Sequence, residues 1–223
     1  MKLVYSGQAI GLLPMQNGAI FAAKQKSLEH KIVISYMLYP FDSLKASPST
    51  KSVYLLAKFG NRFREIEQQL NGYISCSAVA LPGGKQLIVY PSGAAGLFDR
   101  EGRAERGFTM QHEGNGPTGL CFHKGAVWAA YPEAGAIISY DPERFRQTMR
   151  LGGRHTGNFE APESLTSLED RLFVCNAGSG RISCVDTEKY DITGYASFEE
   201  PVHKFLMVEG RGIVLLDSGV YRL

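Results

Sequence analysis

The 223-residue chain contains no long apolar run, no glycine-rich phosphate motif and no cysteine pair at zinc-binding spacing. Without about eighteen consecutive apolar residues, a transmembrane helix is excluded. The absence of GxGxxG and GxxxxGK(S/T) disfavours nucleotide sites, and the absence of a Gly-x-Ser-x-Gly elbow disfavours a serine hydrolase. Residues 1–8 lack the apolar core and the cleavage site of a secretion signal. We therefore expect a cytoplasmic protein.

An excess of charge of either sign is also missing, since 24 Lys and Arg residues stand against 22 Asp and Glu residues. A formal net charge of +2 creates no broad field for nucleic acid or an anionic membrane, so we expect neither as a partner. Cysteines are few and fall inside or beside strand-like runs, at Cys76, Cys121, Cys175 and Cys184. We expect buried reduced thiols. Because Cys175 and Cys184 belong to one predicted hairpin, a disulfide between them is the alternative.

What the sequence does contain is a repeat, marked by an aspartate that returns three times in the same setting. Asp99, Asp141 and Asp186 each follow a strand-like run ending in an apolar or aromatic residue, at steps of 42 and 45 residues. A period in the forties built from strand-like pieces is typical of a β-propeller blade. Each aspartate stands where a turn would join the third and fourth strands, and an aspartate there bonds its own backbone two residues on. We interpret these aspartates as structural.

Strand-like runs separated by turn residues surround each aspartate and give four strands to each unit, the content of one blade. The chain is therefore predicted to be an all-β, single-domain β-propeller. We predict five blades, at about 8–72, 73–115, 116–158, 159–199, and 200–223 together with 1–7. Six blades is the alternative if 8–72 holds parts of two. The last unit has only three strands, so we expect residues 2–6 to supply its outer strand and close the ring.

The first unit is longer than the others and departs from the repeat. Within it, Ile10–Met15 and Ala19–Ala23 are expected to be the first two strands. Tyr54–Phe59 and Arg62–Ile66 are expected to be the last two, joined at a glycine-asparagine turn. Residues 24–52 are interpreted either as an insertion or as part of an extra blade.

The segment from Leu172 to Thr187, LFVCNAGSGRISCVDT, closely resembles the repeat of YVTN/YncE-like β-propellers. Those repeats combine a Val/Tyr-rich strand, an asparagine, a Gly-Ser-Gly turn, a Val/Ile strand and Asp-Thr. Residues 84–110 and 125–151 resemble the repeat more loosely. The resemblance implies a propeller that binds ligands or proteins, while related propellers include metal-dependent lactonases and lyases.

Loop residues that share one position in successive blades are the first candidates for a binding site. Tyr90, Tyr131 and Asn176 end the second predicted strand of three blades, and Asn115 and Asn158 lie in the connections between blades. Function in a propeller resides in such loops. No nucleophile, base and orienting group can be assigned together. The preferred hypothesis is therefore a non-enzymatic binding or scaffolding protein without a cofactor, presenting these loops to a protein, a peptide or a small polar ligand.

The alternative hypothesis is a metal-dependent hydrolase, lactonase or lyase with one divalent metal. Three connections carry histidines or carboxylates, at His112, Glu113, His155, Glu160 and His203. If these side chains meet near the axis, they would bind a metal that polarises a carbonyl or activates water. The offsets of the histidines from nearby prolines differ, which also fits ordinary polar residues on exposed loops.

Overall fold

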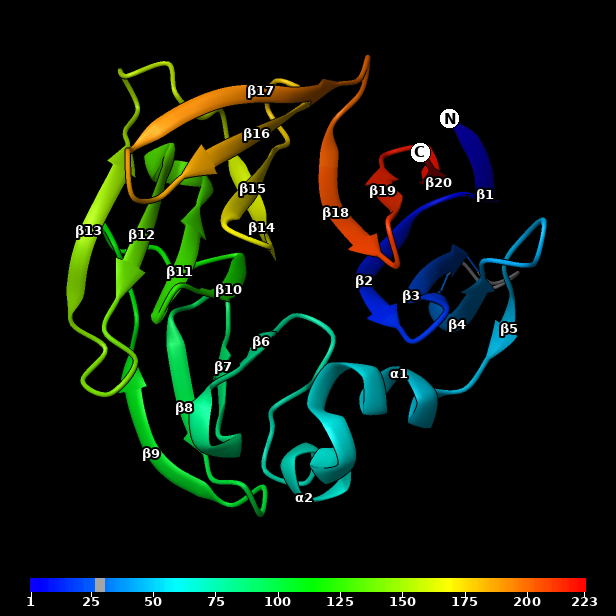
Figure 1. Cartoon of the computed structure of the whole chain (residues 1–223). Helices are drawn as coiled ribbons and strands as arrows, with labels where there is room; N and C mark the ends of the chain where they lie inside the picture. Colours follow the sequence, from blue (N-terminus) through cyan, green and yellow to red (C-terminus); the bar gives the residue numbers. More distant parts are fainter. Residues whose placement is uncertain (27–30) are drawn as a thin grey trace.

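The computed structural model describes residues 1–26 and 31–223, and it is a five-bladed β-propeller. Five antiparallel four-stranded sheets stand around a central axis (Figure 1), which confirms the prediction of five blades rather than six. The inner strands of neighbouring blades contact one another in the order β6, β10, β14, β18 and β2, each strand touching the next. In chain order the strands of the first two blades are β2 (Ala9–Met15), β3 (Gly18–Lys26), β4 (Ile32–Pro40), β5 (Ser47–Ser49), β6 (Ser77–Ala80), β7 (Gln86–Val89), β8 (Ala94–Phe98) and β9 (Ala104–Thr109).

The remaining blades follow the same plan. Their strands are β10 (Gly119–His123), β11 (Ala126–Tyr131), β12 (Ala136–Tyr140), β13 (Gln147–Gly152), β14 (Pro162–Leu168), β15 (Arg171–Asn176), β16 (Arg181–Asp186), β17 (Asp191–Ser197), β18 (Val202–Val208), β19 (Arg211–Leu216), β20 (Gly219–Arg222) and β1 (Lys2–Ser6). Among the described residues, no helix is long and apolar enough to cross a membrane.

The repeated aspartates are turn residues, as predicted. In each of the three turns, one carboxylate oxygen accepts hydrogen bonds from two backbone N–H groups that follow it. Asp99 accepts from Glu101 and Arg103, at 2.9 and 2.8 Å. Asp141 and Asp186 repeat the arrangement with the N–H groups of residues 143 and 144, and of residues 188 and 189. These N–H groups lower the pKa of Asp99 and of Asp186, since they favour the charged carboxylate.

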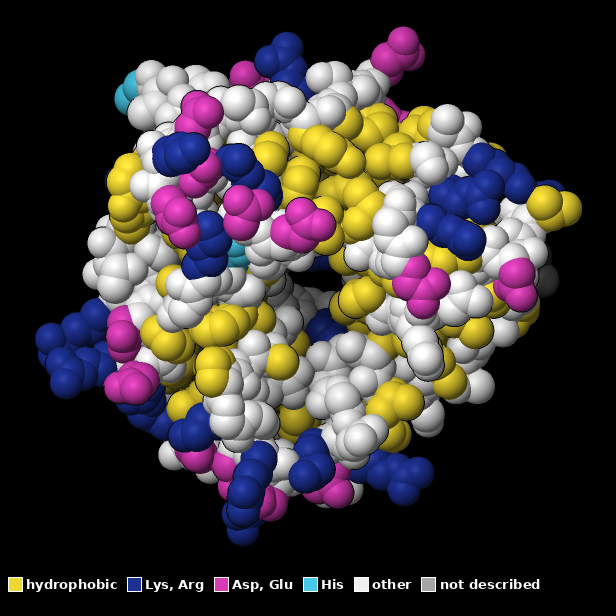
Figure 2. Space-filling model, viewed as in Figure 1, with side chains coloured by type: hydrophobic (Ala, Val, Ile, Leu, Met, Phe, Trp, Pro, Cys, Tyr) yellow, Lys and Arg dark blue, Asp and Glu magenta, His cyan; other side chains and the backbone are white. Residues whose placement is uncertain are grey.

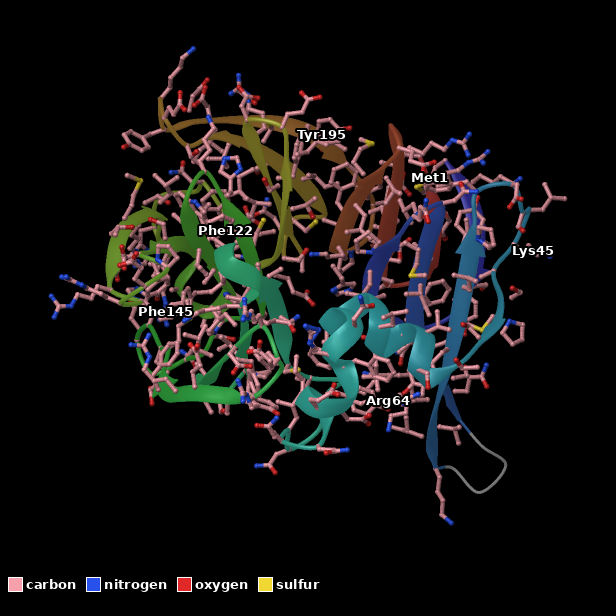
Figure 3. All side chains as sticks on the ribbon, turned by 60° about the horizontal axis from the view of Figure 1, so that its bottom comes forward. Met1, Lys45, Arg64, Phe122, Phe145 and Tyr195 are labelled. Atoms are coloured by element: carbon pink, nitrogen blue, oxygen red, sulfur yellow. The ribbon has the colours of Figure 1, made fainter. Side chains whose placement is uncertain are left out.

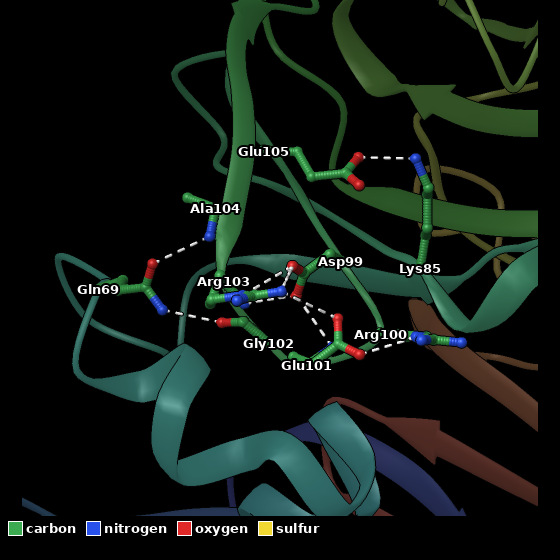
Figure 4. Close-up of polar contacts among 9 residues, drawn as sticks. All are labelled: Gln69, Lys85, Asp99, Arg100, Glu101, Gly102, Arg103, Ala104 and Glu105. Atoms are coloured by element: carbon green, nitrogen blue, oxygen red, sulfur yellow. Dashed lines mark hydrogen bonds and ion pairs between the residues drawn. The ribbon is translucent and has the colours of Figure 1, made fainter.

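Around Asp99 the turn also fastens the second blade to the helical region (Figure 4). The guanidinium of Arg103 pairs with the Asp99 carboxylate at 2.9 Å. The side-chain amide of Gln69 donates to the carbonyl of Gly102 and accepts from the N–H of Ala104, at 2.8 and 3.1 Å. The turn that marks the blade is therefore also a contact between blades.

One prediction for the first unit is wrong: the two segments expected as its last strands are helices. They form α1 (Lys51–Phe59) and α2 (Phe63–Glu67), joined by a 3-10 turn at Gly60–Arg62. Thr50 caps the start of α1, since its side-chain oxygen accepts from the N–H of Val53 at 3.3 Å. Gly60 ends α1 at φ 69°, so the glycine-asparagine pair terminates a helix rather than turning a hairpin.

The helices fill the space between the first and second blades (Figures 1 and 3). Their apolar residues pack against both sheets in one core cluster, whose buried members are Ile20, Ala22, Tyr54, Leu55, Phe59, Ile66, Cys76, Ile88 and Phe98. The third and fourth strands of the first blade come instead from the segment 24–52, for which the sequence left two interpretations. Its described parts, 24–26 and 31–52, supply the end of β3, all of β4 and β5, and the cap of α1. The segment therefore completes the first blade.

Closure by the N-terminal strand is confirmed. β1 pairs antiparallel with β20, from Lys2 opposite Arg222 to Ser6 opposite Gly219. Val4 is buried in a core cluster that also holds residues of β3 and β19, and its carbonyl accepts the N–H of Ala46 at 3.2 Å. The strand is thus bonded on both sides. All four cysteines are free thiols; across the β15–β16 hairpin, Cys175 faces Ile182 and Cys184 faces Phe173.

A glycine substitution tests this closure. In Gly219→Ala, the added Cβ would lie 2.0 Å from the carbonyl oxygen of Tyr5 in β1 at a φ of 154°. We expect a loss of more than about 2 kcal/mol in the free energy of unfolding, measured by urea denaturation.

Gly125→Ala is the matched control, because Gly125 also has a positive φ but has open space where its Cβ would be. It should cost about 1 kcal/mol. Equal losses in the two variants would contradict the role given to the β1–β20 pairing.

Candidate functional site

One candidate site is an axial cavity of about 480 Å³ at the end of the ring where the inner strands begin. Viewed along the axis, Figure 2 shows a central opening with basic side chains inside it. All five inner strands and α1 contribute to the wall, which includes Ile10, Tyr54, Lys58, Cys76, Ser77, Gly119, Leu120, Glu163, Ser164, His203, Lys204 and Asp217. The volume falls in the range of small-molecule sites.

The rim is held together by hydrogen bonds between successive blades. The Ser77 hydroxyl donates to the carbonyl of Thr118 at 2.6 Å, and the Thr118 hydroxyl donates to the carbonyl of Glu163 at 2.8 Å. These residues stand at the start of the inner strands of three consecutive blades. The wall of the cavity therefore has a fixed shape on this side.

On the side of α1, the cavity is lined by Tyr54, Lys58 and Cys76. The Lys58 ammonium donates to the backbone carbonyls of Tyr73 and Ile74, the latter at 3.3 Å. Burial lowers the pKa of Lys58 and raises that of the Cys76 thiol, because both charged forms are desolvated. The Tyr54 hydroxyl is fully buried and has no hydrogen-bond partner among the described residues.

The fourth and fifth blades provide a second basic group, Lys204 of β18. Its ammonium donates to the carbonyl of Leu165 at 3.0 Å, and burial lowers its pKa. Beside Leu165, the Ser164 hydroxyl is buried against the Cys175 thiol and has no nitrogen or oxygen hydrogen-bond partner within the described ranges. Neither Lys204 nor Lys58 forms an ion pair with a carboxylate from the described part of the chain.

His203 lies between two carboxylates in the wall of the same cavity. Its Nδ1 is 2.7 Å from Glu163 and its Nε2 is 2.7 Å from Asp217. Hydrogen bonding to Glu163, with a further contribution from Asp217, raises the pKa of His203 to about 9. The imidazole is therefore protonated at neutral pH and neutralises part of the acidic charge at the cavity wall.

The five residues predicted to bind a ligand do not line the axial cavity. The Tyr90 hydroxyl donates to the carbonyl of Gly72 at 3.1 Å, and the hydroxyls of Tyr131 and Tyr140 bond at 2.6 Å. The Tyr131 bond lies within one blade, whereas the Tyr90 bond ties its blade to the segment that follows α2. Asn115 lies on an exposed loop, where its amide donates to the carbonyl of Glu113 at 3.3 Å.

Two of the five come together elsewhere. Asn158 and Asn176 line a second cavity of about 540 Å³ between the 157–160 loop and the β16–β17 hairpin. The Asn176 side chain is 2% exposed, and its amide donates to the carbonyl of Arg181 and the hydroxyl of Ser183. Its side-chain oxygen has no partner among the described residues. A ligand role for any of the five stays a prediction.

Among the predicted metal ligands, only His203 lines the axial cavity. His112 lies 3.6 Å from Glu113, which in turn faces Arg150 and Arg154. His155 and Glu160 are exposed. In the described ranges, no three His, Cys, Asp or Glu side chains are grouped so as to hold a metal ion. The metal hypothesis stays a prediction.

Sequence reasoning missed four residues of the cavity wall, namely Tyr54, Lys58, Ser164 and Lys204. The first two belong to a segment interpreted as strands. The other two could have been found from the repeat, because each is a polar residue near the start of an inner strand, directly after a titratable residue. Polar residues near the start of an inner strand therefore indicate the wall of the axial cavity.

Neither protein-family models nor curated proteins match the sequence. Solved structures resemble the fold at low identity. Glutaminyl cyclase of Myxococcus xanthus aligns with a TM-score of 0.55 and 10% identity, over 99% of this chain and 92% of that one. Sqt1 of Saccharomyces cerevisiae gives 0.53 and 11%, over 96% and 71%. Streptogramin B lyase gives 0.53 and 11%, over 95% of this chain and 63% of the lyase. At such identities the similarity establishes the fold alone, and enzymes share this fold with other proteins.

The pairing of His203 predicts a dependence of stability on pH. The pKa of His203 is raised above its unfolded value, so its contribution is complete below about pH 6.5 and is lost as the pH rises toward 9. We expect the urea midpoint of the wild-type protein to fall across this window and that of His203→Asn to fall less.

His155→Asn is the matched control, since His155 is exposed and makes no such pair. Its pH profile should follow that of the wild-type protein. Parallel profiles for His203→Asn and the wild-type protein would show that the two carboxylates do not stabilise a protonated imidazole.

Proposed function

We propose that this protein is a binding propeller that holds a small polar ligand in its axial cavity. The observation that carries the proposal is that Tyr54 and Ser164, two residues of the cavity wall, have buried hydroxyls without a nitrogen or oxygen hydrogen-bond partner among the described residues. Leaving a buried polar group unpaired costs about 1–3 kcal/mol, and a bound ligand or ordered water removes that cost. A cavity of about 480 Å³ has room for a small organic molecule.

The mixed wall supports a ligand with both polar and apolar parts. Ile10 and Leu120 provide apolar surface, while Lys58, Ser164 and Lys204 provide donors. Small-molecule sites commonly have this composition, in which a few polar groups orient the ligand and apolar contacts contribute affinity. A binding function requires no nucleophile; the Cys76 thiol of the wall is hydrogen-bonded to Lys58, and burial raises its pKa.

The proposal is tested with a panel of amino acids, short organic acids and polyols in a thermal-unfolding assay. A ligand present at a hundred times its dissociation constant stabilises the folded state by about 2.7 kcal/mol, so we expect a rise in Tm on the order of 5 °C. Ser164→Val should abolish the rise, because it replaces a cavity hydroxyl with an apolar group.

Ser197→Val is the matched control, since Ser197 is a strand serine that lines the second cavity instead. It should keep the response of the wild-type protein. Loss of binding in Ser197→Val with retention in Ser164→Val would move the ligand to the second cavity and contradict the proposal.

A second candidate is the metal-dependent hydrolase, lactonase or lyase. One observation favours it: His203, one of the predicted ligands, lies in the wall of a cavity large enough for a substrate, between Glu163 and Asp217. A metal there would polarise a substrate carbonyl or activate water. The acidic partners already hold the imidazole through both ring nitrogens, so metal binding would require at least one of these contacts to break.

Elemental analysis of protein purified without a histidine tag separates the two candidates. We expect less than one equivalent of any transition metal, with no change in His203→Ala or in the double variant His112→Ala/His155→Ala. One equivalent of metal that is lost in either variant would favour the enzyme over the binding protein.

A further inference from the structure

The cavity contains two lysines whose charge the protein does not balance. Lys58 extends from α1 and Lys204 from β18, and these elements lie on different sides of the central opening (Figure 1). The other basic residues of the wall differ from them. His203 is paired with Glu163 and Asp217, and Lys24 is exposed, so it keeps its hydration.

The donors of the Lys204 ammonium exceed the acceptors that the described residues offer. An ammonium has three N–H donors. Lys204 uses one on the carbonyl of Leu165, whereas Lys58 has three partners, the carbonyls of Tyr73 and Ile74 and the sulfur of Cys76. Withdrawing an ammonium from water costs several kcal/mol unless it is paired with an opposite charge. Both groups lack a carboxylate partner among the described residues, and Lys204 also has donors to spare.

Each lysine also has one of the unpartnered hydroxyls near it. Tyr54 precedes Lys58 by four residues on α1, and the Lys58 ammonium lies 5.9 Å from the centre of the Tyr54 ring. Ser164 directly precedes the residue whose carbonyl accepts from Lys204. A carboxylate has two oxygens and accepts several hydrogen bonds, so it can use an ammonium and a hydroxyl together. The cavity thus has two cation–hydroxyl pairs.

We infer that the axial cavity binds a small organic acid with two carboxylates, one at Lys204 and Ser164 and the other at Lys58 and Tyr54. This inference rests on the proposed function and names its ligand class. An organic acid fits better than an inorganic anion, because the cavity of about 480 Å³ exceeds a single ion and apolar residues such as Ile10 and Leu120 line part of it. Charge-assisted hydrogen bonds supply most of the expected specificity.

The first experiment compares succinate, butyrate, butane-1,4-diol and sulfate by isothermal titration calorimetry at constant ionic strength. These probes share a short chain or a double charge but differ in carboxylate number. We expect succinate to bind at least about tenfold more tightly than butyrate, since each charge-assisted contact contributes about 1.5–3 kcal/mol. The diol and sulfate should bind more weakly still.

Variants assign the binding to the two lysines. Lys204→Met and Lys58→Met should each weaken succinate at least about tenfold, while Lys189→Met, at an exposed position outside the cavity, should leave it unchanged. Replacement of a buried charge by an apolar side chain of similar length is often neutral or stabilising, so Lys204→Met is expected to fold. Its urea midpoint verifies this. Should it unfold, Ser164→Ala provides the same comparison at the neighbouring hydroxyl.

A proton measurement distinguishes specific pairing from general attraction. A carboxylate beside a lysine raises the pKa of that lysine, so binding takes up protons at an alkaline pH at which part of the lysine has lost its proton. The titration enthalpy of succinate should then change with the ionisation enthalpy of the buffer in the wild-type protein, and change less in Lys204→Met.

The outcomes separate this inference from the proposed function. If the diol bound as tightly as succinate and Ser164→Val abolished its binding, the cavity would be a ligand site and the inference of a diacid would be wrong. Sulfate binding as tight as succinate binding would make it a site for inorganic anions, which also contradicts the inference. If no member of the wider panel bound, both proposals would fail.

Discussion

The structure depends on the backbone pairing between β1 and β20. That pairing joins the two ends of the chain: β1, which leads directly into the first blade, covers the edge of β20 and becomes the outer strand of the last blade. The axial cavity exists only because five inner strands converge, so its volume and its wall follow from the same closure. No single residue determines the shape of a binding site assembled in this way. That shape depends on the position of the first residues of each inner strand.

The helices α1 and α2 are the second determinant of the cavity. Four of the blade junctions bring inner strands into direct contact, whereas α1 lies against β2, β3 and β4 and packs toward the second blade. A helix introduces side chains at spacings that strands do not provide, and α1 uses this to place Tyr54 and Lys58 in the wall. The part of the ring that departs from the repeat is therefore the part that gives the cavity its individual chemistry.

Much of the fold could be predicted from the sequence, because a repeat reports the same local physics several times. The aspartates at 99, 141 and 186 predicted the turns between third and fourth strands, and the three-stranded last unit predicted closure by β1. The helices were missed because Tyr54–Phe59 and Gly60-Asn61 have both strand-like composition and a hairpin signal. The competing signal for a helix was Thr50, which caps α1. Packing between two blades stabilises that helix.

The site was predicted poorly for a related reason. Loop residues such as Tyr131 and Asn176 share a position in the repeat, yet their polar atoms are used to brace the blades. Apart from those of α1, the polar groups of the cavity wall such as Ser164 and Lys204 come from strand starts, where a polar residue in an otherwise apolar segment gives a weak signal. Whether a hydroxyl or an ammonium finds a partner depends on residues far away in the chain. Lys204 and Leu165, for example, lie in different blades.

The antiparallel register that places Lys2 opposite Arg222 has a consequence for how the chain folds. Contacts between residues so distant in sequence carry the largest loop-closure entropy, and they slow folding when they must form in the rate-limiting step. Each of the second, third and fourth blades consists of strands adjacent in sequence, so it can form as the chain leaves the ribosome. The last blade is complete only when β20, which is made last, pairs with β1, which is made first. Until the two meet, β20 presents an open edge, and a second copy of the chain that supplied its own β1 would satisfy that edge equally well.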